Sequence, residues 1–452
     1  MIRLWTPWFV MFICITITNA NLRGRPGEGY YIEVSIGSPK QTFNVLVDTG
    51  STNFAVAAAS HPNVDIFFIR SNSSTYVSHQ KKVSVVYTQG FWSGELGSDV
   101  VCFPSLHVPE VRCDVAAIQS SHNFYMNGSR WQGILGLAYP VIARPDRNVV
   151  SWLEGLQRRK GNATVSFALK LCGSQDKENR HTGVLEILEK EPEMQDEYMT
   201  SPLIREWFYE LLLYGIRVGE EKVDLPCQVF NTDKTILDSG TTSLRLPNPV
   251  FLEVVRLLNT SVAKQSVPVT DDFWMQQKMF CWKDPLDWTQ FPNISLALVH
   301  SKNDYFVLEL PPQSYIRQAS DNTEAVGVQN CYKFSVESSN TGTVLGVVAM
   351  EGFHIIFNRS SKTIGFSKSD CGPSVGLRGP FKTRTDLLKR CINPTPPPPV
   401  SALTVAAYVV AALMSVCCVM FMYLLSQWLW ETYVKKKKPA SCSSETSLIT
   451  DE

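Results

Sequence analysis

Most of the chain between residues 21 and 391 consists of short runs in which apolar and polar positions alternate, separated by Gly, Pro, Asn and Asp. Such alternation is typical of half-buried β-strands. Strands are predicted at 30–36, 42–47, 83–88, 98–103 and 114–118. Helical spacing is rare, and its best examples lie at 151–156 and 249–259. The pattern therefore predicts a mainly β protein.

Residues 1–20 have the features of a secretory signal peptide. Arg3 gives a positive start, the run from Trp8 to Ile17 is apolar, and Ala20 ends a stretch suited to cleavage. An uncleaved membrane anchor is the alternative. The polar, glycine-rich sequence that follows favours cleavage, so we expect the mature chain to begin near residue 21.

A second apolar stretch, residues 402–426, contains no charged residue and is long enough to cross a membrane as a helix. A buried core helix is the alternative. Four lysines follow at 435–438. Positive charge stays on the cytosolic side, so the body is predicted to be lumenal and the tail, residues 427–452, cytosolic. Residues 392–401 are proline-rich and predict an extended spacer between body and membrane.

Charge adds one exclusion. The chain has 42 basic and 42 acidic residues, which cancel. A nucleic-acid partner therefore has no electrostatic support.

The cysteines and glycosylation sequons agree with a lumenal body. Of the 12 cysteines, Cys14 leaves with the signal and Cys417, Cys418 and Cys442 belong to the membrane or cytosol, so eight remain. An even number in an oxidising compartment predicts four disulfides, although eight cysteines allow 105 pairings. Their wide spread argues against a metal knuckle. The N-x-S/T sequons are Asn72, Asn127, Asn162, Asn259, Asn293 and Asn358.

Two short segments of the chain repeat one another. "LVDTGSTNFAV" at 46–56 and "ILDSGTTSLRL" at 236–246 each place an aspartate, Asp48 or Asp238, between an apolar run and a small-residue turn. One such turn can occur by accident, but two in the same setting indicate a repeat.

A second repeated element supports this interpretation. Two apolar residues precede a glycine in "GILGLA" and again in "TVLGVV", at Gly136 and Gly346. Each follows its own aspartate turn. Two copies of one lobe, residues 21–202 and 203–391, explain both repeats.

Each aspartate is predicted to be buried where water is scarce, which disfavours its charge. Two such groups brought together by lobe symmetry can share one proton, because neighbouring like charges do not both ionise cheaply. One then serves as a base and the other as an acid, a pair suited to activating water and protonating a carbonyl. This chemistry calls for no cofactor and no metal. Two structural turns in a β domain are the alternative.

Three pairs of neighbouring residues suit that chemistry. A pair of glycines permits tight turns and close approach of a substrate, a pair of hydroxyls can hold the carboxylates in plane, and a third pair can brace the two loops against each other. In this order they are Gly50 and Gly240, Ser51 and Thr241, and Thr49 and Ser239.

At these residues the sequence resembles the pepsin-like aspartic proteases and, within them, the membrane-anchored β-secretases (memapsins). The resemblance runs from about Asn21 to Cys391 and continues into the membrane anchor. Its motifs are "NLRG", "GYY", "VDTGSTNFAV", "VYTQGFWSGELG", "WQGILGLAY", "IARPD", "REWFYE", "LDSGTTSLRLP", "CYKF", "TGTVLG" and "MEGF". It implies a bilobed fold with pseudo-two-fold related lobes, and Asp48 and Asp238 as the catalytic dyad of an endopeptidase.

The resemblance also implies a β-hairpin flap at "VVYTQG" that closes over the substrate. Tyr87 would be the flap tyrosine, Trp92 its hydrogen-bond partner, and Thr88 and Gln89 further substrate contacts. An ordinary hairpin with a packed tyrosine is the alternative. The position of the hairpin, between the first aspartate and the first apolar–apolar–Gly, favours the flap.

Arg245 breaks the internal repeat, because Ala55 stands at its place in the first copy. An arginine so close to a buried acid needs a reason. The resemblance favours a substrate-binding arginine that prefers polar or acidic side chains beside the cut bond. A structural salt bridge is the alternative.

Six cysteines match the disulfide frame of the family. The implied pairs are Cys172–Cys371, Cys227–Cys391 and Cys281–Cys331. Cys102 and Cys113 match no part of that frame. They flank a predicted hairpin connection, so we predict a fourth bridge between them, with two free thiols as the alternative.

The two ends of the chain carry further expectations. A prosegment is expected to be short or missing, either because the enzyme needs none or because this is an incomplete or alternative gene product. In the tail, "ETSLI" resembles an acidic dileucine signal, which implies endocytic sorting adaptors as partners and traffic between cell surface, Golgi and endosomes. Cys442 is a candidate for palmitoylation.

The combined features predict a single-pass type I aspartic endopeptidase that cuts lumenal peptide segments of membrane-anchored proteins. A catalytically silent protease-fold receptor or binding protein is the alternative, but degenerate aspartate turns would mark it, and both turns here are intact. Another hydrolase or a metalloenzyme finds little support, since the sequence has no G-x-S-x-G or H-E-x-x-H motif and its seven histidines are scattered.

Overall fold

The computed structural model separates into two compact units, Met1–Asn393 and Pro394–Glu452. It describes residues 18–25, 27–88, 90–174, 180–188, 197–265, 267, 269–282, 286–319, 331–392 and 402–434. Most of the predicted signal, the spacer from residue 393 and the tail from residue 435 lie outside the described residues. Thr18 to Ala20, assigned to the signal, continue the first strand.

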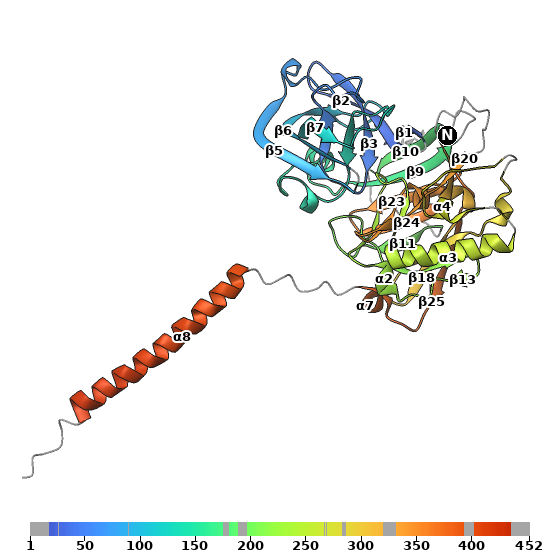
Figure 1. Ribbon diagram of the computed structural model, residues 1–452. Helices are drawn as coiled ribbons and strands as arrows, with labels where there is room; N and C mark the ends of the chain where they lie inside the picture. Colours follow the sequence, from blue (N-terminus) through green and yellow to red (C-terminus); the bar gives the residue numbers. More distant parts are fainter. Residues whose placement is uncertain are drawn as a thin grey trace, which may run out of the picture. The chain divides into compact units, whose positions relative to one another are not determined.

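The first unit is mainly β, as predicted (Figure 1). Within the described residues its largest sheet has 13 strands. In spatial order they are β11 (Met199–Pro202), β24 (Thr363–Lys368), β23 (Phe353–Asn358), β9 (Ser166–Ser174), β10 (His181–Leu188), β1 (Thr18–Arg25), β2 (Gly29–Ile36), β3 (Gln41–Asp48), β8 (Gly133–Gly136), β4 (Phe54–Ala57), β7 (Val111–His122), β6 (Phe91–Cys102) and β5 (Val77–Val86).

Three smaller sheets belong to the second half of the body. One consists of β13 (Glu221–Lys222), β12 (Leu213–Val218), β17 (Ile294–Val299), β18 (Asp304–Leu310) and β25 (Gly376–Lys382). Another consists of β14 (Thr235–Leu237), β22 (Thr343–Leu345), β15 (Leu244–Pro247) and β21 (Val336–Ser339). The third consists of β16 (Phe280–Cys281), β20 (Cys331–Phe334) and β19 (Ile316–Gln318).

Both helices predicted from the sequence are present. α1 (Trp152–Arg159) begins after Ser151, whose side chain accepts a hydrogen bond from the N–H of Glu154 and so caps the helix. α3 (Asn248–Lys264) buries an apolar stripe that includes Phe251 and Leu258. The short helical segments are η1 (Arg70–Asn72), η2 (Pro140–Ile142), α2 (Cys227–Phe230), α4 (Asp271–Trp274), η3 (Trp288–Gln290), α5 (Pro312–Tyr315), α6 (Val347–Met350) and α7 (Leu387–Cys391).

The internal repeat is present as one set of strand pairings made twice. β3 pairs in parallel with β8, and β14 pairs in parallel with β22. In each copy the next strand, β4 or β15, then pairs antiparallel with the same partner. Gly136 and Gly346 lie directly against the backbone of the aspartate turns, where a side chain would collide. This contact explains the glycine that follows two apolar residues in both copies.

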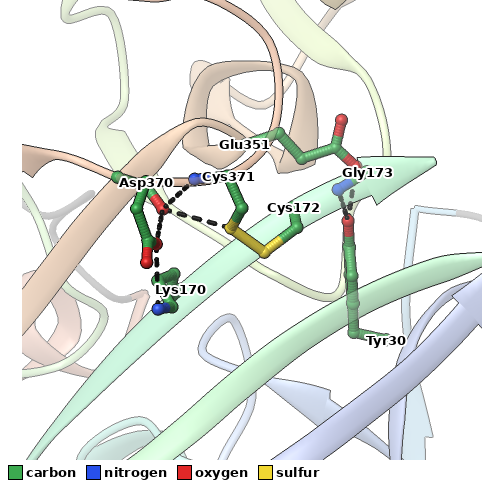
Figure 2. The surroundings of a disulfide bond; sticks show 8 residues. Tyr30, Lys170, Cys172, Gly173, Glu351, Asp370 and Cys371 are labelled. Atoms are coloured by element: carbon green, nitrogen blue, oxygen red, sulfur yellow. Dashed lines mark hydrogen bonds and ion pairs between the residues drawn. A yellow bond between two sulfur atoms is a disulfide. The ribbon is translucent and has the colours of Figure 1, made fainter. Parts of the chain in front are cut away.

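The two halves of the body are joined covalently and by a buried polar network (Figure 2). Cys172 on β9 forms a disulfide with Cys371, which follows β24. Beside it, the Tyr30 hydroxyl donates to Glu351 at 2.6 Å and accepts from the N–H of Gly173 at 2.8 Å. The network ties β2 of the first half to the segment after α6.

Three disulfides are present among the described cysteines, in the pairs that the resemblance implies: Cys172–Cys371, Cys227–Cys391 and Cys281–Cys331. The fourth bridge was predicted wrongly, because Cys102 and Cys113 are both free thiols. They do flank a β-hairpin connection, between β6 and β7. In its register Cys113 lies opposite Asp99, three positions from Cys102. An odd offset places the two side chains on opposite faces of the sheet.

The second unit contains α8 (Ala402–Leu429), which continues as the π-helical turn η5 (Trp430–Val434). Within the described residues, Leu413–Tyr433 is the one helical segment apolar and long enough to cross a membrane. Its 21 residues exceed the roughly 20 that a bilayer requires.

Candidate active site

The two aspartates stand at equivalent places in the two copies of the repeat. Asp48 is the last residue of β3, and Asp238 directly follows β14. Both strands are buried, because each is covered by its parallel partner and by apolar side chains of the core. Asp48 is 4% exposed, and Asp238 is partly buried. The strand ends thus hold both carboxyl groups in a largely dry environment.

The turn glycines show how closely the two aspartates approach. A Cβ atom added to Gly50 would collide with the Asp238 carboxyl group, and one added to Gly240 would collide with that of Asp48. Each carboxyl group therefore lies against the opposite turn. Only glycine allows this approach at both positions.

Each carboxyl group is held in the same way. The N–H of Gly50 donates to one oxygen of Asp48 at 2.8 Å, and the Ser51 hydroxyl donates to the other. In the second copy, the N–H of Gly240 donates to Asp238 at 2.9 Å. The Thr241 hydroxyl donates to the second oxygen of Asp238 at 2.8 Å. These bonds keep both groups in fixed planes, facing each other.

Thr49 and Ser239 bind the two turns together. The N–H of Thr49 donates to the Ser239 hydroxyl at 3.1 Å, and the N–H of Ser239 donates to the Thr49 hydroxyl at 2.9 Å. The Thr49 hydroxyl donates in turn to Leu237, and the Ser239 hydroxyl to Val47, so each reaches the strand of the other copy. All of these groups are buried.

Electrostatics distinguish the dyad from ordinary acidic residues. Burial, followed by the negative charge of Asp238, raises the pKa of Asp48 well above its usual range. The hydrogen bonds from Ser51 and Gly50 offset only part of this effect. A pair in this arrangement retains one proton where a solvated aspartate would have lost it.

The hairpin of β5 and β6 is closed by a backbone hydrogen bond next to its tip. The N–H of Tyr87 bonds to the carbonyl of Gly90 at 3.0 Å, and Gly90 takes the left-handed conformation with φ +82°. Thr88 is exposed at the tip, and Gln89 lies outside the described residues.

The tyrosine of the hairpin, Tyr87, contacts two neighbouring aromatic side chains. Its hydroxyl accepts a hydrogen bond from the indole N–H of Trp92 at 3.1 Å, the predicted pairing. Its ring stacks on Phe124 at 5.6 Å. Burial and then the charge of Asp48 raise the pKa of Tyr87, and the hydrogen bond from Trp92 opposes this rise.

Arg245 makes the salt bridge that the sequence left as an alternative. It lies on β15 opposite Glu337 on β21, and the guanidinium Nε is 3.2 Å from the Glu337 carboxylate. The Arg245 side chain is 10% exposed and that of Glu337 is 29% exposed. The pair is therefore accessible from solvent on the glutamate side.

A cavity that was not predicted from the sequence lies beside the second aspartate turn. Its volume is about 110 Å³, and Gly29, Thr242 and Val347 contribute to its wall. Arg317 and Lys333 also line it. The available signals were the "GYY" motif and the second threonine of the aspartate turn, both of which lie at this cavity.

Comparisons with known proteins identify the family of the chain. The family model described as eukaryotic aspartyl protease matches residues 29–369. The chain is 38% identical over 434 residues to a protein named Beta-secretase from Strongylocentrotus purpuratus, covering 88% of this chain and 79% of the relative. It is 26% identical to Pepsin A of Gallus gallus and 25% identical to Gastricsin of Rattus norvegicus, with 75% of this chain covered in both cases, and 83% and 81% of those proteins.

The sequence similarity to a β-secretase and the apolar helix Leu413–Tyr433 together fit a single-pass membrane protein. The facing aspartates, the family match and the relatives lead to one conclusion. The chain belongs to the eukaryotic aspartyl proteases and is an aspartic endopeptidase of the β-secretase type.

Proposed function

We propose that Asp48 and Asp238 form the catalytic dyad and hydrolyse peptide bonds through a water molecule held between them. One carboxylate takes a proton from the water, whose oxygen attacks the peptide carbonyl carbon. The other, protonated, carboxyl group gives its proton to the carbonyl oxygen. The resulting tetrahedral diol collapses when a proton passes to the amide nitrogen and the C–N bond breaks. The observation that supports this most directly is the contact of each carboxyl group with the opposite turn glycine.

The neighbouring residues receive roles in the same proposal. Gly50 and Gly240 let the substrate backbone approach the dyad, while Ser51 and Thr241 keep the carboxylates in plane. The flap closes over the substrate through Tyr87, with Trp92 holding the tyrosine hydroxyl. Thr88 and Gln89 contact the substrate at the flap tip.

Arg245 is proposed to bind substrate side chains from within its ion pair. A polar or acidic side chain beside the cut bond would compete with, or add to, the Glu337 carboxylate. The partial exposure of Glu337 supports this view, because the pair is not sealed inside the core.

The substrates are proposed to be lumenal peptide segments of membrane-anchored proteins. The apolar helix would tether the enzyme in the same membrane as its substrate and confine cleavage to segments near the bilayer. The lysines at 435–438 favour a type I orientation with the catalytic body lumenal or extracellular. The tail is proposed to engage sorting adaptors and direct traffic among cell surface, Golgi and endosomes.

Cleavage of a mixed peptide library by the full-length protein in detergent tests this function, at about pH 4.5 and about pH 7.5, with and without a statine-type inhibitor. We expect endoproteolysis that is faster in acid and is blocked by the inhibitor, because the dyad must retain its shared proton. A folded, correctly disulfide-bonded sample that cuts no peptide at either pH would contradict the proposal and favour a catalytically silent binding protein.

A further inference from the structure

The five-stranded sheet of the second half buries one face and leaves the other open. Leu296 and Leu308 are among the side chains that point into the core. The opposite face forms a groove of about 520 Å³ across β12, β17, β18 and β25. Small residues, Ser295 and Ala297, lie at its floor together with Gly215, where an added Cβ would meet no atom within 4 Å. The groove is therefore open to solvent along the strands.

Aromatic rings form one end of this groove. The Tyr214 and Tyr305 rings lie 4.9 Å apart, and the Phe381 ring lies 5.5 Å from that of Tyr305. Phe381 is 39% exposed, so part of its ring faces solvent. These rings offer apolar faces to whatever occupies the groove.

Charged side chains border the same groove. Arg217 bonds to Glu220 on one edge, and Arg378 bonds to Glu309 on the other. Aromatic faces flanked by such donors and acceptors suit a carbohydrate, whose C–H groups pack on rings and whose hydroxyls bond to charged groups.

A glycosylation sequon opens directly onto the groove. Asn293 lines it, is exposed, and immediately precedes β17. Its backbone carbonyl accepts a bond from the N–H of Gly219 at 2.8 Å, which fixes the position of the residue. The level of Ala297, near the aromatic end, lies about 13 Å away along the strand, at 3.3 Å per residue. The first sugars of a glycan can follow this path.

We propose that the groove is a carbohydrate-binding site occupied by the N-linked glycan attached to Asn293 of the same chain. The sugars pack on Tyr214, Tyr305 and Phe381 and cover the open sheet face. The glycan thereby acts as a structural part of the second half and protects its exposed aromatic surface.

The fold leaves room for a glycan at some sequons but not at others. Asn358 is 3% exposed, and its side-chain oxygen accepts bonds from the N–H groups of Ser360 and Ser361. A glycan there is incompatible with this fold. Asn72, in contrast, is exposed and lines no groove described above. It provides a matched control for Asn293.

Site-resolved mass spectrometry of full-length protein from secretory cells, digested under native conditions with peptide N-glycosidase, tests the proposal. We expect Asn293 to carry a glycan that is released several-fold more slowly than the glycan on Asn72, because its first sugars are sheltered. The double variant Tyr305→Ser, Phe381→Ser should raise the Asn293 rate to that of Asn72. If Asn72 carries no glycan, the rate of glycan release from Asn293 in the native protein is compared instead with its rate of release after denaturation.

Hydroxyl-radical labelling supplies a second readout. Tyr305 and Phe381 should be labelled several-fold more in Asn293→Gln than in the wild type, and Asn72→Gln should leave their labelling unchanged. An unoccupied Asn293 would overturn the proposal. So would equal release rates, or rings that remain protected in Asn293→Gln, which would indicate another occupant.

Discussion

Thr49 and Ser239, which stand at the same place in the two copies of the repeat, exchange hydrogen bonds between the two aspartate turns. Each backbone N–H donates to the other residue's hydroxyl, at 3.1 and 2.9 Å. Each hydroxyl then donates to a carbonyl of the opposite strand, at 2.9 and 2.7 Å. This buried hydrogen-bond network, together with side-chain packing, therefore sets the distance between the two aspartates.

Thr49→Val should weaken this hydrogen-bond network while keeping the shape of the side chain. The buried N–H of Ser239 would lose its acceptor, at a cost of about 1–3 kcal/mol in the free energy of unfolding. We expect kcat to fall more than KM rises, because the dyad geometry loosens. Denaturant unfolding and steady-state kinetics measure both effects, with Thr49→Ser as the matched control that should retain both. A Thr49→Val enzyme with wild-type stability would contradict this role.

Asp48→Asn and Asp238→Asn should each abolish peptide cleavage. Each substitution removes one of the two carboxyl groups that share the proton, and should therefore lower kcat/KM by at least about 10²-fold. Secretion and the three disulfides should be retained, because the amide oxygen still accepts one hydrogen bond and the amide N–H can donate to the neighbouring hydroxyl, Ser51 or Thr241. Full activity in either variant would refute the dyad assignment.

Activity should be favoured by acid. Burial and the charge of Asp238 raise the pKa of Asp48, so the pair keeps its shared proton at low pH and loses it as pH rises through this raised value. The pH profile of kcat/KM measures the effect. A rate that rises steadily toward neutral pH would contradict this assignment.

The contribution of Asp48 to the free energy of unfolding should also be greatest in acid. In the unfolded chain Asp48 titrates near its ordinary value of about 3.9. Its folded pKa is raised, so its contribution to stability is complete below the unfolded value and is lost as pH rises through the folded value. The difference in free energy of unfolding between wild type and Asp48→Asn should therefore favour the wild type most in acid. A difference that does not change with pH would show that Asp48 titrates normally.

Arg245 and Glu337 together distinguish a specificity role from a structural one. Arg245→Ala should alter the preference beside the cut bond and reduce stability by only about 1 kcal/mol, since Glu337 remains partly solvated. Glu337→Gln should release the guanidinium and strengthen the preference for acidic side chains. Library cleavage profiles measure both variants. Unchanged profiles accompanied by a large loss of stability would favour the structural salt bridge.

Cys102 and Cys113 should both be found as thiols. Burial raises the pKa of each thiol, which keeps the reactive thiolate scarce. In the native protein both should react slowly with an alkylating reagent, and Cys113, at 1% exposed, more slowly than Cys102. Denaturation without reduction should make both reactive. Peptide mass spectrometry that finds the two linked would contradict the register of β6 and β7.

Much of the site could be predicted from local sequence. Apolar runs that end in Asp48 and Asp238, with small-residue turns after them, specify buried strand ends through burial and turn geometry alone, and these operate over a few residues. The alternating runs likewise predicted β2, β3, β6 and β7. The disulfide frame came from the family resemblance rather than from spacing.

Other features were decided only by the tertiary structure. The pairing of Arg245 with Glu337, the separation of Cys102 from Cys113, and the position of Asn293 beside an aromatic groove all depend on how distant strands align. A shift of one residue in strand register reverses which face a side chain occupies, and that register is set by packing across the whole sheet. Local sequence determined which residues form the strands and turns, and long-range packing determined which of them meet.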